Sequence, residues 1–290
     1  MRKFFPLILT STLTSTQSFA FNQFEVFTQV QHTHLTREYE SHFLLNDEKN
    51  RTYNGLDAKA GIFEIGVSTP MYGNTKIIGS ISIGDNSYQN ILWINQYSME
   101  NTIGNPPNSG GYNEYSGGHL KYKNYKIGIE NQTTDMLVTG VYFAKEEIDS
   151  RAETLHSSTI PASTYFEESY KLEGYSDIRS QTPFRNIQVG IQNIITLRRS
   201  DVSQKFWYNG ANNLLSFNTP SFQILSSPYM VARVAPNLSM RMSLTHTVLK
   251  GFKQKDVEFE KNTLTQISNV GVDAYSGSQT SIALSANYHF

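Results

Sequence analysis

Nine charged side chains occupy alternating positions in stretches that otherwise alternate between apolar and polar residues. Because residues two apart in a β-strand share a face, these charges should face one compartment and their apolar neighbours another. Charges of both signs on one face could line a solute-selective pore or form ion pairs in a closed interior. The nine candidate lumen-lining residues are Glu64, Lys126, Glu130, Glu167, Lys171, Glu173, Arg198, Arg233 and Arg241.

A histidine pair lies near the start of the chain, in the sequence His32-Thr33-His34. Two imidazoles on one face of a strand could contact one metal ion. Two histidines without a third ligand at fixed spacing do not complete a site, so we expect a polar strand end with no metal and no cofactor.

The familiar catalytic motifs are absent from the sequence. It contains no Gly-x-Ser-x-Gly, no His-Glu-x-x-His and no phosphate-binding glycine loop. Asp57 stands alone, and His246 is expected to point toward lipid. A triad is assembled in space, so an enzyme stays open although no catalytic residue is assigned.

Composition excludes several classes of function. Residues 1–20 contain Arg2 and Lys3 and no acidic residue, so removing them leaves 22 basic against 25 acidic residues, a net charge of −3. This balance argues against nucleic-acid binding. Without cysteines, the chain can form neither disulfides nor thiolate sites.

The first twenty residues have the pattern of an export signal. A basic start is followed by the apolar stretch 4–13 and by Ser18-Phe19-Ala20, which fits the small-x-small cleavage rule. We therefore expect cleavage after Ala20 and a single mature domain spanning residues 21–290.

The last twelve residues alternate strictly between two faces. Ile282, Leu284, Tyr288 and Phe290 share one face, and polar or small residues occupy the other. This segment resembles the last strand of bacterial outer-membrane barrels, which typically ends in Phe with an aromatic residue two positions earlier. The resemblance implies that Tyr288 and Phe290 are an assembly signal for the barrel-assembly machinery, in an outer membrane containing lipid and lipopolysaccharide.

The rest of the chain predicts an all-β, transmembrane, antiparallel up-and-down barrel of about ten strands, with twelve possible and fourteen less favoured. Short turns are expected at 70–74, 123–124, 181–183 and 235–237, on the periplasmic side. Long external loops are expected at 35–54, 99–114, 146–163, 200–220 and 251–277. The strands are expected near 23–34, 55–69, 75–98, 115–123, 125–145, 164–180, 184–199, 221–235, 237–250 and 278–290. The segment 131–135 could hide an additional turn.

Aromatic residues should form belts at the two membrane interfaces. One belt is expected to contain Tyr72, Tyr122, Tyr125, Tyr288 and Phe290, and the other Trp93, Tyr97, Tyr142, Phe143 and Tyr165. Further aromatics lie in the expected loops, where they could contact sugars or proteins or pack over the mouth of the barrel: Tyr39, Phe43, Tyr53, Tyr112, Tyr115, Trp207 and Tyr208.

Two classes of function fit these features. The preferred hypothesis is a small porin-like channel for polar solutes with a lumen of mixed charge. The alternative is a surface-exposed binding or adhesin-type barrel, or an enzyme like the omptins. Omptins are ten-stranded surface proteases with paired aspartates and an Asp–His pair at the rim, and this sequence has no close Asp pair and no Asp-x-His. The solute, the surface ligand and the oligomeric state stay undetermined.

Overall fold

The computed structural model describes residues 24–45, 48–86, 91–98, 109–153, 163–184, 186–208, 211–254, 257–261 and 267–290. The expected export signal at residues 1–20 lies outside this part of the chain. Within it, no helix is long and apolar enough to cross a membrane.

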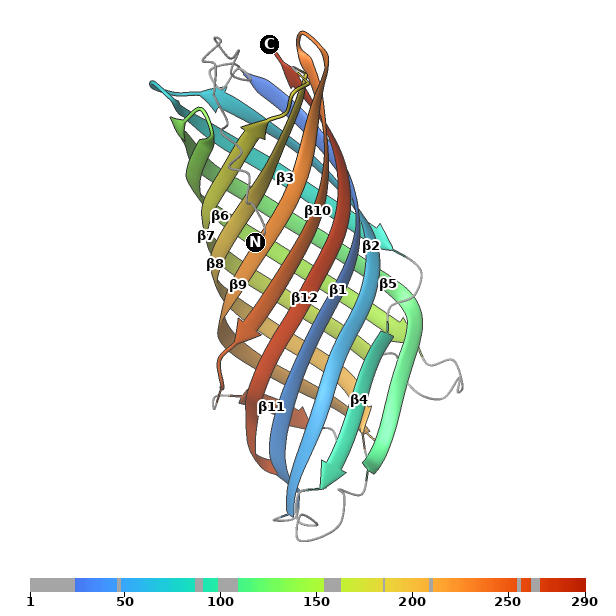
Figure 1. Cartoon of the computed structure of the whole chain (residues 1–290). Helices are drawn as coiled ribbons and strands as arrows, with labels where there is room; N and C mark the ends of the chain where they lie inside the picture. Colours follow the sequence, from blue (N-terminus) through green and yellow to red (C-terminus); the bar gives the residue numbers. More distant parts are fainter. Residues whose placement is uncertain are drawn as a thin grey trace, which may run out of the picture.

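The described chain forms one antiparallel sheet that closes on itself (Figure 1). Its strands are β1 Glu25–Leu45, β2 Glu48–Pro70, β3 Thr75–Asn86, β4 Ile91–Ser98, β5 Ser109–Thr134, β6 Leu137–Glu153, β7 Ser163–Gln181, β8 Ile187–Tyr208, β9 Ala211–Ala235, β10 Leu238–Gly251, β11 Val257–Lys261 and β12 Ile267–His289.

Closure comes from β1, which pairs with β2 on one side and with β12 on the other. β3 and β4 both lie between β2 and β5, and β10 and β11 both pair with β9. The result is a closed ten-stranded barrel, which confirms the predicted fold class.

One end of the barrel carries the short connections 71–74, 135–136, 182–186 and 236–237; we call it the turn end and the opposite end the loop end. Gly73 has a φ of 58°, a left-handed conformation that glycine adopts without strain, in the predicted turn at 70–74. The chain end also lies at the turn end, where the Phe290 amide donates to the Phe24 carbonyl.

The predicted turn at 123–124 is wrong. Lys123 and Asn124 lie inside β5, and the connection to β6 is at Asp135 and Met136. The predicted strands 115–123 and 125–145 are therefore displaced, and the segment 131–135, considered as a hidden turn, leads directly into the real one. The alternation of side chains continues through Asn124, whereas one polar Asn had been read as a break in the strand.

The predicted long loops are also largely strand. β1 runs on to Leu45 and β2 begins at Glu48, so most of the expected loop 35–54 belongs to the sheet. From Val30, an exposed apolar residue of β1, to Leu45, about 3.3 Å per residue and a tilt of about 40° give roughly 35–40 Å of further barrel height.

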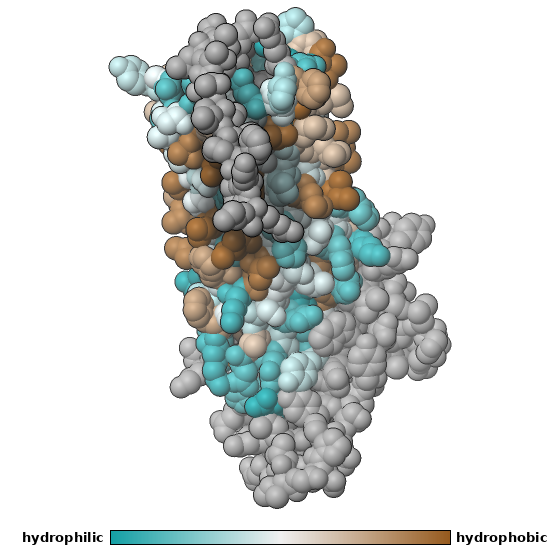
Figure 2. Space-filling model, in the orientation of Figure 1, coloured by the Kyte–Doolittle hydropathy of each residue, from teal (hydrophilic) through white to brown (hydrophobic). Residues whose placement is uncertain are grey.

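On the face that Figure 2 shows, apolar side chains form a belt over the turn-end half of the outer wall, and hydrophilic side chains dominate the described part of the other half. The belt consists of outward aliphatic and aromatic residues from neighbouring strands, because every second residue of a strand faces outward. Its exposed members include Val30, Phe63, Ile65, Ile81, Ile127, Ile129, Val141, Phe143, Leu172, Ile195, Leu197, Ile224, Met242, Leu244, Ile282 and Leu284.

Three aromatic residues assigned to the belts point inward instead. Tyr122, Tyr142 and Tyr165 are buried in the barrel interior. Tyr125, Phe143, Tyr288 and Phe290 are exposed on the outer wall, and the side chains of Trp93 and Tyr97 lie outside the described residues. The errors follow from the misplaced turn and from assigning residues near strand ends to a belt without considering which face of the strand they occupy.

A pair of adjacent substitutions tests the assignment of faces. Leu244 is exposed in the belt, whereas the adjacent Ser243 is buried on the inner wall. Leu244→Arg should lower the free energy of unfolding by about 2–4 kcal/mol, because it places a charge in the lipid. Ser243→Arg reaches the polar interior and should lower it less. Urea titration of protein refolded in lipid measures both, and equal losses would contradict the assignment.

Cysteine labelling tests the corrected connection between β5 and β6. The turn end is expected to face the periplasm. In intact cells a membrane-impermeant thiol reagent should then label Ser109→Cys and leave Met136→Cys unlabelled, and disruption of the outer membrane should expose Met136→Cys. The opposite pattern would show that the barrel is inserted the other way up.

Candidate functional site: the barrel interior

Five charged side chains meet inside the barrel, and we call them the ion layer: Arg37, Glu146, Glu167, Lys171 and Arg198. They come from β1, β6, β7 and β8. All five are buried, with side-chain exposures between 0 and 6 %. Each of them faces inward because every second residue of its strand points into the lumen.

The ion layer spans the lumen. β1 and β7 lie on opposite sides of the barrel, and the Arg37 Nε donates to Glu167 across it at 3.1 Å. Arg198 Nη1 lies 2.9 Å from Glu146, and Arg198 Nη2 contacts Glu167. Lys171 Nζ contacts Glu146 at 2.6 Å. A closed network across a barrel of this size leaves little room for a continuous water path.

Tyrosine and serine hydroxyls supply further hydrogen bonds to the two carboxylates. Tyr275 from β12 donates to Glu167 at 2.6 Å, and Tyr165 donates to the same carboxylate at 3.1 Å. Tyr122 donates to Glu146 at 2.9 Å. Buried charges require partners of this kind, because an unpaired charge away from water is costly.

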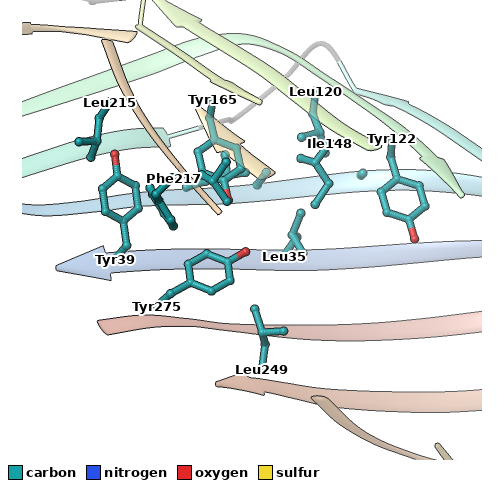
Figure 3. Close-up of a cluster of buried hydrophobic side chains, with 14 of the residues drawn as sticks. Leu35, Tyr39, Leu120, Tyr122, Ile148, Tyr165, Leu215, Phe217, Leu249 and Tyr275 are labelled. Atoms are coloured by element: carbon teal, nitrogen blue, oxygen red, sulfur yellow. The ribbon is translucent and has the colours of Figure 1, made fainter. Parts of the chain in front are cut away.

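An apolar core fills the barrel beyond the ion layer, toward the loop end. Figure 3 shows Tyr39, Leu215, Phe217 and Tyr275 among side chains from several strands that point toward one another. Tyr39 donates a 2.6 Å hydrogen bond from β1 to Gln204 on β8. Tyr39 was expected in a loop and is instead buried in this core.

A polar cavity of about 340 Å³ lies on the other side of the ion layer, toward the turn end. Its wall carries ion pairs between strands: Lys76–Glu130 joins the neighbouring β3 and β5 at 3.3 Å, and Lys126–Glu173 joins β5 and β7 across β6 at 3.3 Å. Arg241 lies over the ring of Tyr229, 3.8 Å from its centroid. The interior therefore has three levels: cavity, ion layer and apolar core.

The nine candidate lumen residues occupy different levels. Glu64, Lys126, Glu130, Glu173 and Arg241 line the cavity. Lys171 borders the cavity and belongs, with Glu167 and Arg198, to the ion layer. Arg233 lies at the turn-end rim, where its guanidinium donates to the Pro236 carbonyl.

Two members of the ion layer were missed from the sequence. Arg37 and Glu146 lie in segments predicted as loops. The signal that could have found Arg37 is the continuing alternation of Leu35, Arg37 and Tyr39, all buried on one face.

Two histidine–aspartate pairs lie on the outer wall, and neither was visible in the sequence, because cross-strand register brings them together. His34 Nε2 is 2.6 Å from Asp57, and His42 Nδ1 is 2.7 Å from Asp273. Lys253 also contacts Asp273 at 2.5 Å. Partial burial raises the pKa of Asp273, but hydrogen bonds from Lys253 and His42 outweigh it and hold the pKa below its ordinary value.

Metal ligands are not clustered in the part of the chain that the structure describes: no three His, Asp or Glu side chains there form a group that could hold an ion. His32 and His34 both lie on the outer wall, and His34 pairs with Asp57.

Comparisons with known proteins identify the class of protein to which this chain belongs but no family within that class. No protein-family model matches the sequence, and no curated protein matches it. Among solved structures, the outer membrane protease OmpT from Escherichia coli is similar with a TM-score of 0.59 at 9 % identity, covering 92 % of this chain and 97 % of that one. The translocator domain of the autotransporter NalP from Neisseria meningitidis gives a TM-score of 0.44 at 10 % identity, with coverages of 92 % and 88 %.

The closed barrel, its apolar belt and this likeness define the class: the chain is an outer-membrane β-barrel protein. At 9 % identity the likeness to OmpT concerns the fold alone.

The ion layer can be tested by removing one carboxylate. Glu167 faces both Arg37 and Arg198, so Glu167→Gln leaves buried positive charge without its partner. We expect the free energy of unfolding to fall by about 3–5 kcal/mol. Arg233→Gln at the exposed rim is the matched control and should change it by less than about 0.5 kcal/mol. Urea unfolding of the refolded proteins compares the two, and a silent Glu167→Gln would refute the structural role.

Proposed function

We propose that this protein is a non-conducting outer-membrane barrel that acts at the cell surface through its loop end, as a binding platform. The observation that carries this proposal is the set of contacts across the lumen, Arg37–Glu167 and Tyr275–Glu167. Because these contacts join opposite sides of the lumen, a solute could pass through the barrel only if buried ion pairs were broken.

The length of the barrel beyond the belt supports a surface role. Continuous strands hold the loop end away from the lipid on a rigid sheet, and binding residues are commonly positioned by such scaffolds. Polar outer-wall side chains, including the His42–Asp273–Lys253 group, would be accessible there. Aromatic residues in the predicted loops, such as Tyr112 and Trp207, would provide contact area for a sugar or a protein.

The second candidate is the porin-like channel favoured by the sequence. The polar cavity supports it, since Glu64, Lys126 and Arg241 could select solutes at its wall. Conduction would require the ion layer and the apolar core to rearrange.

Single-channel recording on refolded protein separates the two candidates. The native protein should show no conductance, because the interior is packed across its full width. Conductance with ion selectivity that shifts on Arg241→Gln would instead support the channel, since that guanidinium borders the cavity and lies outside the ion layer.

The binding proposal needs a direct measurement at the cell surface. Intact cells displaying the protein should bind to arrays of immobilised oligosaccharides or proteins, and replacement of residues 99–108 or 154–162 by Gly-Ser segments should abolish the signal. Arg233→Gln is the control, because it lies at the turn end. Binding lost in Arg233→Gln but retained after both replacements would contradict a role for the loop end.

A further inference from the structure

Six polar side chains form one continuous row on the outer wall, and we call them the polar row: Thr139, Ser176, Asn193, Ser226, His246 and Thr280. Each is the direct register partner of the next, so the row runs across β6, β7, β8, β9, β10 and β12. All six face outward by strand alternation.

The middle of the polar row lies inside the apolar belt. The next outward residues toward the loop end, which are register partners of one another, are Val141, Gly174, Ile195, Ile224, Val248 and Ser278. Those on its turn-end side include Ile178, Ile191, Pro228, Leu244 and Ile282. On β8, β9 and β10 the row is thus flanked by apolar residues on both sides. Lipid chains offer no hydrogen-bond partner to polar groups at this depth.

Contacts within the row satisfy part of its hydrogen-bonding capacity. Ser226 donates to Asn193 at 3.1 Å, and His246 Nδ1 lies 3.0 Å from the Thr280 hydroxyl. The second ring nitrogen of His246 and the amide NH₂ of Asn193 have no partner among the described residues. An imidazole and a carboxamide each have hydrogen-bonding groups to spare after one such bond.

The strand pairing is also interrupted at this place. β9 and β10 pair at Tyr229 with Ser243 and again at Ser226 with His246, with no ladder pair between them. Pro228 lies in this gap and has no N–H to give to the ladder. On the inner side the Ser227 and Thr245 hydroxyls bridge the same gap at 2.9 Å. The middle of the polar row therefore coincides with a place in the belt where the pairing between β9 and β10 is interrupted.

We propose that the polar row is an interface at which a second copy of this chain docks within the membrane. Two copies inserted the same way up can be related by a twofold axis along the membrane normal, and such an interface brings the same patch of each copy together. With the axis between β9 and β10, Ser226 of one copy faces His246 of the other, and the reverse. The contact is therefore made twice.

The chemistry of the row suits a self-complementary contact. Hydroxyl, carboxamide and neutral imidazole groups each donate and accept hydrogen bonds, so the row can pair with its own copy without a complementary charge. Ile195, Ile224, Leu244 and Val248 beside it would supply apolar packing. Polar side chains that bond across transmembrane elements associate them in this way.

Crosslinking tests the geometry. Because the chain has no cysteine, Ser226→Cys near the proposed axis should form a disulfide-linked dimer on mild oxidation in the membrane. Ile127→Cys, equally outward but on β5, is the matched control and should stay monomeric. Equal crosslinking at both positions, or crosslinking of Ser226→Cys to a different protein, would overturn the proposal.

Energy transfer tests the affinity. Copies of the protein labelled at Asp135→Cys with a fluorescent donor or acceptor are placed together in phosphatidylcholine vesicles. Energy transfer between copies should rise with the density of protein in the membrane. The double variant Asn193→Leu/His246→Leu should weaken association at least about tenfold. Thr28→Val, another outward polar-to-apolar change, should leave it unaltered.

The double variant remains informative about folding. Leucine at lipid-facing positions should stabilise the isolated barrel, so the variant should keep the heat-modifiable gel mobility of a folded barrel. Two results would overturn the proposal. The native protein would show no more energy transfer than random proximity predicts, or the folded double variant would show the same transfer as the native protein.

Discussion

The closure of β1 onto β12 is the constraint on which the rest of the structure depends. In hydrocarbon every backbone N–H and C=O needs a partner within the protein, and a sheet meets this condition only when it has no free edge. The register Val30–Leu284 and its neighbours complete the ring. Once the ring is closed at ten strands, each inward side chain faces a confined space and each outward one faces lipid or solvent, so strand alternation alone decides which residues can meet.

The ion layer shows how confinement changes the role of charge. Arg37 on β1 comes from the opposite side of the ring to Glu167 on β7 and Arg198 on β8, yet the narrow interior brings the three into contact. Their tyrosine partners and the apolar core beyond them complete the packing. On the outer wall the same alternation gives a different result: Lys145 pairs with Glu147 and Glu168 in solvent, as an ordinary surface group.

The sequence predicted the class of fold, the approximate number of strands and most faces, because these depend on alternation within single strands. It failed at Asn124, where a turn-forming residue lies inside a strand, and in segments such as 35–54, whose polar outer face resembled a loop. The ion layer could not be assembled in advance, since Arg37 and Glu146 were not yet on strands. The pairs His34–Asp57 and His42–Asp273 depend on register between strands, which alternation does not determine.

The burial of the ion layer has a consequence for the medium that surrounds a bacterium. Dissolved salt screens exposed charges over about 8–10 Å at physiological ionic strength, but it reaches buried pairs far less. The outer-wall group formed by Lys145, Glu147 and Glu168 should therefore weaken in brine and strengthen in fresh water, while Arg198 and Glu167 keep their contact in both. A barrel held by enclosed charges keeps its internal architecture as the osmolarity outside the cell rises and falls.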